Sequence, residues 1–259
     1  KQYCEEQNSI NTIYFTTMKN RNIIIDFMDA ISSGVSISHI LEKALVIASY
    51  IGNDKLIKFI NCEKNGYPID EAIPDYRRVN ARVEAVFVGK FISPQTVIIP
   101  AKLIEDHRVQ DLMSSVNIRE SLLQLEKMSQ DNDDPLMSVE LSATYHPLIE
   151  SMFEKSEYTV EKAYYSFPKT SLQSIIRSFK TLLHDLMLQF DKDFDWDKEL
   201  SSTPNKEKVS SIMNNVITHH MVTINDFSPT IANKKNVIEV MERKLILPFN
   251  MAECILFNK

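Results

Sequence analysis

Along the first third of the chain, apolar residues recur every three or four positions, which is the period of an amphipathic α-helix. The pattern predicts three short helices, at 24–31, 37–48 and 54–65. Ser36 and Asn53 are placed to cap the start of the second and third helices, and Gly52 and Gly66 are placed to end them. Val46 widens the apolar stripe of the second helix, which predicts a central, buried helix.

After Pro74 the period of the apolar residues changes to two, which is typical of half-buried strands. The alternation predicts strands at 79–87, 91–99, 137–141 and 158–165. Pro94 predicts that its strand lies at a sheet edge, since proline cannot donate to the ladder. Between these strands we expect two helices, at 101–113 and 118–128, the second with Asn117 and Glu120 as a capping box.

The strongest helical pattern covers residues 169–190, where one apolar stripe continues for the whole length. We expect this helix to cover the sheet. The predicted class is therefore α+β: an N-terminal helical subdomain packed on a small, mostly antiparallel sheet that a long amphipathic helix covers. The expected divisions are an extension at 1–17, a domain at 18–190 (helical at 18–72, sheet and helices at 76–190), a linker at 191–208, and a segment of unknown role at 209–259, with a strand at 221–224 and a helix at 236–244.

The charge balance disfavours a nucleic-acid partner. The chain carries 29 basic and 35 acidic residues, a formal net charge of −6, whereas proteins that bind duplexes usually carry a basic excess. Arg77, Arg78 and Arg82 form the densest basic group, which we expect to be a solvated strand edge. The apolar runs are too short for a membrane span, and three isolated cysteines fit a reducing compartment. We expect a cytoplasmic protein.

Motifs that bind metals or phosphates fail on their spacing. Four glycines in the whole chain leave no phosphate-binding loop and no nucleophile elbow. The acidic run that starts at Asp191 imitates a calcium loop, but Trp196 occupies the position that needs glycine and Ser202 the position that needs glutamate. We therefore expect no metal and no cofactor.

One pair of residues suggests a reaction. Arg177 and His184 lie seven positions apart on the long predicted helix, which places them near one face and two turns apart. Such a pair could stabilise a cleaved phosphate and act as acid or base, and it resembles the arginine–histidine motif of ribonucleases of the HEPN type. The alternative interpretation is that both residues are ordinary polar groups on the solvent side of the helix.

A second resemblance extends over more of the chain. It is carried by Ile37 to Ala48, Ile51-Gly52-Asn53, Glu63-Lys64-Asn65-Gly66-Tyr67 and Ile73-Pro74-Asp75-Tyr76-Arg77. These stretches resemble the AbiTii domain of bacterial abortive-infection proteins. The match is good over 22–90 and looser to about 190, and Phe59 and Lys64 stand where tryptophan and leucine are usual. The motif residues that we interpret as structural are Gly52, Asn53, Asn65, Gly66, Tyr67, Pro74, Asp75, Tyr76 and Arg77.

The resemblance implies a role in antiphage defence and implies no known reaction. We expect a non-enzymatic sensor, regulatory or oligomerisation module. A ribonuclease of the HEPN type that uses Arg177 and His184 is the alternative. The expected partners are further copies of the chain, for which the apolar helix faces and the tail at 255–257 offer surface, together with a partner defence protein, a phage component or a small signal.

Overall fold

A computed structural model describes residues 22–90, 92–104, 107–130, 134–153, 158–195 and 202–220. They form two compact units. The helical unit gathers the described residues within Lys1–Arg77, Arg119–Asp131 and Leu172–Thr223, and the sheet unit those within Arg78–Ile118 and Asn132–Ser171. The α+β class is thereby confirmed. The expected extension at 1–17, the strand at 221–224, the helix at 236–244 and the tail at 255–257 lie outside the described residues.

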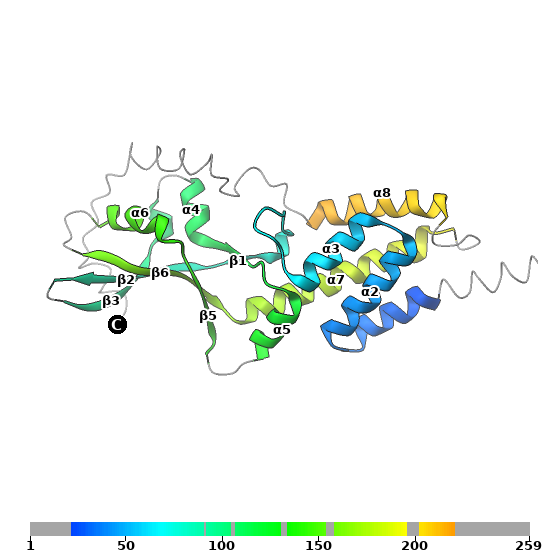
Figure 1. Cartoon of the computed structure of the whole chain (residues 1–259), viewed down its shortest axis with the longest axis horizontal. Helices are drawn as coiled ribbons and strands as arrows, with labels where there is room; N and C mark the ends of the chain where they lie inside the picture. The colour runs from blue at the N-terminus through cyan, green and yellow to red at the C-terminus, as the bar shows by residue number, and fades with distance from the viewer. Residues whose placement is uncertain are drawn as a thin grey trace, which may run out of the picture. The chain divides into compact units, whose positions relative to one another are not determined.

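The helical unit is assembled from three separate stretches of the chain. Its helices are one at 22–32, α2 (Ile37–Ile51), α3 (Asp54–Asn65), the short η1 (Asp75–Arg77), α5 (Leu122–Gln130), α7 (Thr170–Asp193) and α8 (Thr203–His220). Phe179 of α7 contacts Phe59 of α3, with 6.2 Å between ring centroids. Figure 1 shows α3 beside α7. We expected α7 to cover the sheet, but it belongs to the helical unit instead.

The ends of α2 and α3 lie where the sequence placed them. The Ser36 side chain accepts a hydrogen bond from the first turn of α2, and Gly52 ends this helix in the left-handed conformation, with a φ of 70°. Asn53 caps α3 through its side chain. The prediction that α2 is buried on most sides is wrong, because Val46 is 67% exposed. One face of α2 is buried and the opposite face is open to solvent.

The start of α5 differs from the prediction. The helix begins at Leu122 rather than at 118. The capping box is formed by Ser121 and Gln124, which bond reciprocally: the Ser121 hydroxyl accepts from the Gln124 N–H, and the Gln124 side chain accepts from the Ser121 N–H, both at 3.2 Å. The predicted box at Asn117 and Glu120 is therefore wrong. The predicted linker at 191–208 is helical at both of its ends, since it includes the last residues of α7 and the first of α8.

The sheet unit contains two antiparallel sheets. Its elements are β1 (Arg78–Asn80), β2 (Arg82–Gly89), β3 (Ile92–Ile99), η2 (Ala101–Leu103), α4 (His107–Ser114), β4 (Ser115–Asn117), β5 (Leu136–Glu140), η3 (Ala143–Tyr145), α6 (His146–Ser151) and β6 (Thr159–Pro168). The larger sheet has the strand order β3-β2-β6-β5, and β1 pairs with β4. The single strand expected at 79–87 is split at Ala81, whose N–H bonds to the Ser114 carbonyl.

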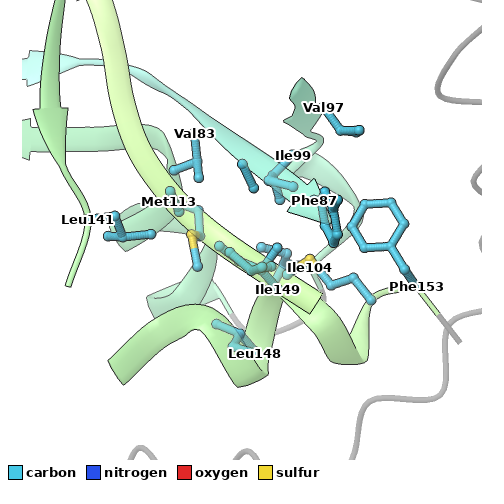
Figure 2. Packing of buried hydrophobic residues seen from close by; sticks show 14 of the residues in the cluster. Val83, Phe87, Val97, Ile99, Ile104, Met113, Leu141, Leu148, Ile149 and Phe153 are labelled. Atoms are coloured by element: carbon cyan, nitrogen blue, oxygen red, sulfur yellow. The ribbon is translucent and has the colours of Figure 1, made fainter. Parts of the chain in front are cut away.

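Helices α4 and α6 cover one face of the four-stranded sheet (Figure 1). The core between them contains alternate residues of β2, including Val83 and Phe87, against Leu148 and Ile149 of α6 and Met113 of α4. Figure 2 shows these side chains pointing into one apolar layer. β3 lies at one edge of the sheet, as its proline predicts, and β5 lies at the other.

Candidate functional site

Four polar side chains of the family motif meet inside the helical unit: Glu63, Tyr67, Tyr76 and Arg77. Glu63 lies in the last turn of α3, Tyr67 follows the end of this helix, and the other two belong to η1. Both Glu63 and Arg77 are 0% exposed. Because a buried charge is unfavourable unless it is paired and hydrogen-bonded, the bonds among these groups decide whether the arrangement is stable. We call the four residues the buried cluster.

The carboxylate of Glu63 is the centre of the buried cluster. Its Oε1 accepts hydrogen bonds from the Tyr67 hydroxyl at 2.7 Å and from the Tyr76 hydroxyl at 2.6 Å. Its Oε2 accepts a bond from the Arg77 guanidinium at 2.6 Å. The same guanidinium donates to the Glu120 carbonyl at 2.7 Å and lies 4.8 Å from the centre of the Tyr67 ring. Each polar group of the cluster therefore has a partner inside the protein.

The surroundings of Glu63 set the protonation of its neighbours. Burial, reinforced by the negative charge of Glu63, raises the pKa of Tyr67 and that of Tyr76 well above the ordinary value. Burial alone would lower the pKa of Arg77, but the charge and hydrogen bonds of Glu63 outweigh it and the pKa is raised. The two tyrosines are thus neutral donors, and the arginine stays charged.

Gly66 ends α3 and forms the turn that brings Tyr67 close to Glu63. Its φ of 94° and ψ of 163° lie in a region that only glycine adopts readily. A Cβ at this position would lie 2.9 Å from the carbonyl oxygen of Arg119. That carbonyl accepts a hydrogen bond from the Tyr67 N–H at 2.8 Å. Glycine is therefore required both for the backbone conformation and for the close approach of the two chain segments.

The remaining motif residues surround the buried cluster or cap helices. Pro74 is buried, and its carbonyl accepts from the Arg77 N–H at 3.0 Å. Asn65 and Asp75 are exposed, while Gly52 and Asn53 form the junction between α2 and α3. The structure thus brings together Tyr67, Tyr76 and Arg77 of the predicted residues and leaves these others outside the cluster.

The sequence interpretation missed Glu63 as a site residue, although Glu63 begins one of the motif stretches. One signal was available: Glu63 and Tyr67 are four positions apart at a helix end, a spacing that brings side chains together. The interpretation of the basic group was wrong for Arg77, which is buried. Arg78 and Arg82 are exposed as expected, but Arg82 lies on β2, an inner strand with a neighbour on each side and not an edge.

Arg177 and His184 both lie on α7, as the sequence predicts. Arg177 is exposed, and the His184 side chain is 37% exposed. The Nδ1 of His184 lies 4.0 Å from a carboxylate oxygen of Asp185, its neighbour on the same helix. Both residues belong to the side of α7 that faces away from its buried stripe of leucine and phenylalanine residues.

In the part of the chain that the structure describes, no group of three or more histidine, cysteine, aspartate or glutamate residues is arranged to hold a metal ion. Within the same ranges, no helix combines the length and the apolar character that crossing a membrane requires.

The fold is that of an α+β protein whose helical unit is organised around a buried Glu–Arg pair. A family model described as AbiTii matches residues 24–216, which include the whole buried cluster. The chain belongs to the AbiTii family. The family name connects it with abortive infection, a form of bacterial antiphage defence. A search of curated proteins and a search of solved structures gave no match.

Proposed function

We propose that the chain acts in abortive infection as a non-enzymatic module that senses or regulates and that associates with itself. The observation that carries this proposal is the place of the motif residues. Four polar side chains of the motif, those of the buried cluster, bond to one another in the interior of the helical unit. A motif of this kind preserves a scaffold, and the function then belongs to the surfaces that the scaffold presents.

The charges of the buried cluster support the same proposal. A catalytic acid or base must exchange a proton with a substrate within hydrogen-bond distance. Tyr67 and Tyr76 keep their protons and donate them in hydrogen bonds to Glu63, and both Glu63 and Arg77 are fully buried. The cluster is therefore suited to holding three chain segments together, and poorly suited to acting on a bound substrate.

The partners we propose are a second copy of the chain, a partner defence protein, a phage component or a small signal. Self-association would give the chain two states, silent and active, whose balance a signal could shift. Capture of proteins from infected cells with the full chain as bait would identify the signal or the partner.

Phage plating on cells that express single variants tests the proposal. We expect His184→Ala and Arg177→Ala to protect as well as the wild type does, because exposed substitutions usually change stability by less than ~0.5 kcal/mol. Gln189→Ala, at another partly exposed position of α7, is the matched control. Gly66→Val should abolish protection, because a β-branched residue cannot adopt the backbone conformation found there.

Circular dichroism of each purified variant separates loss of activity from loss of folding. If His184→Ala is folded and soluble but no longer protects, while Gln189→Ala protects, the non-enzymatic proposal is wrong. The ribonuclease that uses Arg177 and His184 then takes its place, and RNA from infected cells should be cleaved by the wild type only.

A further inference from the structure

Among the residues that the structure describes, strand β5 forms an open edge of the four-stranded sheet. β6 pairs with it on one side, and β5 ends the strand order on the other. The pairing is regular over its whole length, from Leu136 opposite Pro168 to Glu140 opposite Tyr164. An open edge presents unpaired N–H and C=O groups, which form a template for another strand.

The directions of the backbone groups on β5 follow from the register. The Leu141 N–H bonds to the Ala163 carbonyl at 2.8 Å, and hydrogen-bonded pairs alternate along an antiparallel ladder. Val139, two positions earlier, therefore also points its N–H and C=O groups toward β6. Those of Ser138 and Glu140 point away from β6, to the open edge. The Leu136 N–H is already bonded to the Asp134 side chain at 2.8 Å.

The two edges of the sheet differ in their protection. β3 carries Pro94, which offers no donor, and its pairing with β2 is interrupted by a register shift next to Gly89. Both are devices by which proteins discourage pairing at an edge. β5 contains no proline, no lysine and no register shift. The open edge of β5 is therefore the one suited to pairing.

One antiparallel register makes the β5 edge complementary to itself. When two copies pair about Val139, Ser138 of each copy lies opposite Glu140 of the other, and the outward groups form about four backbone hydrogen bonds. Pairing about Glu140 would place two carboxylates opposite each other, which is unfavourable. Pairing about Ser138 would place Glu140 opposite Leu136, whose N–H is already used.

The apolar side chains of β5 favour the same register. Val139 is half-buried and packs against the core on the covered face of the sheet, and Met137 is half-buried. In the register centred on Val139, the two Val139 side chains face each other. Met137 of each copy then lies opposite Leu141 of the other. The apolar side chains on the covered face of one sheet are thereby continuous with those on the covered face of the other.

We infer that β5 pairs with β5 of a second copy of this chain, antiparallel and centred on Val139. The two four-stranded sheets then form one continuous sheet. This inference rests on the self-association that we proposed above and gives it a place and a register. A closed two-fold pairing also removes the free edge from both copies, so assembly stops at a dimer through this strand.

Light scattering on the purified full chain tests the pairing. We expect the wild type to be dimeric at micromolar concentration, and Ser138→Glu to weaken the dimer by roughly tenfold or more, because it creates two carboxylate–carboxylate contacts. Glu140→Lys alone replaces each Ser–Glu contact with a Ser–Lys contact and should stay dimeric. The double variant Ser138→Glu/Glu140→Lys creates two opposite-charge contacts and should restore or strengthen the dimer.

Two further variants control for folding. Ser138→Ala keeps the backbone and should stay dimeric, whereas Ser138→Pro removes a donor that faces away from β6 and should be monomeric with an unchanged circular dichroism spectrum. A monomeric wild type would overturn the inference together with the proposed self-association. A dimer that survives both Ser138→Glu and Ser138→Pro would show that the copies associate through a surface other than the β5 edge. Failure of the double variant to restore the dimer would show that the register centred on Val139 is wrong.

Discussion

Removal of the charge from Glu63 should cost a large part of the stability of the protein. Glu63→Gln keeps the size and the acceptor oxygen of the side chain but leaves the Arg77 guanidinium buried without a counter-charge. Both side chains are 0% exposed, and the closest N–O distance between them is 2.6 Å. Breaking such a buried pair costs ~3–5 kcal/mol, against a total of ~5–15 kcal/mol for a typical domain.

The two tyrosines add to this cost. Each donates to the charged carboxylate, and a hydrogen bond to a charged group contributes ~1.5–3 kcal/mol where a neutral one contributes ~0.5–1.5 kcal/mol. Glu63→Gln therefore weakens two bonds and leaves one charge unpaired. We expect the free energy of unfolding to fall by at least ~3 kcal/mol, the lower end of the range for a broken buried pair, because the structure can relax around the guanidinium and offset part of the cost.

A double-mutant cycle in urea measures the interaction. Arg77→Met should also cost ~3–5 kcal/mol, because it leaves the Glu63 carboxylate buried without its cation. The combined Glu63→Gln/Arg77→Met variant removes both charges, so its cost should fall short of the sum of the single costs by at least ~2 kcal/mol. The helical circular dichroism signal follows unfolding, and midpoints are compared only where the urea slope is unchanged.

Glu42→Gln serves as the control, since Glu42 is an exposed acid on α2 and its replacement should cost less than ~0.5 kcal/mol. A cost below ~1 kcal/mol for Glu63→Gln would show that the buried pair contributes little to stability. Simple addition of the two single costs would show that the two side chains do not stabilise each other.

Two further results follow from the same region. Gly66→Ala should destabilise the protein by more than ~2 kcal/mol in urea, since its Cβ would meet a backbone carbonyl. Gly34, which also has a positive φ (75°) but open space around it, is the control, and Gly34→Ala should cost only ~1 kcal/mol. Equal costs would show that the close approach at Gly66 does not matter. The pKa of Tyr76 is raised in the folded protein, so its contribution is complete below the unfolded value of about 10 and is lost as pH rises beyond it. Tyr76→Phe should therefore reduce the alkaline loss of stability by up to about 1.4 kcal/mol per pH unit, as thermal unfolding between pH 8 and pH 11 would show.

Local features of the fold could be predicted from the sequence because their causes are local. The three N-terminal helices, their caps and the edge position of Pro94 follow from period, capping residues and the missing proline donor. The start of α5 was misplaced because Asn117 and Glu120 have the same spacing as Ser121 and Gln124, and a spacing alone does not say which pair bonds.

Features that depend on distant parts of the chain could not be predicted in this way. The strand expected at 79–87 is split because β1 pairs with β4, more than thirty positions later. The stripe on α7 predicts a buried face but does not name the surface that buries it. Arg77 looked like a member of a surface basic group, because nothing in its own neighbourhood shows that Glu63, fourteen positions earlier, faces it inside the protein.

The position of the motif limits what substitutions in it can reveal. Glu63, Tyr67, Gly66 and Arg77 hold the loop after α3 against η1 and against the backbone at 119–120, so replacing any of them destabilises the scaffold and every surface that depends on it. A loss of phage protection at these residues would therefore not locate the functional surface. Substitutions that leave the buried cluster intact, such as those at Ser138 and His184, are the ones whose effects on defence can be assigned to a surface.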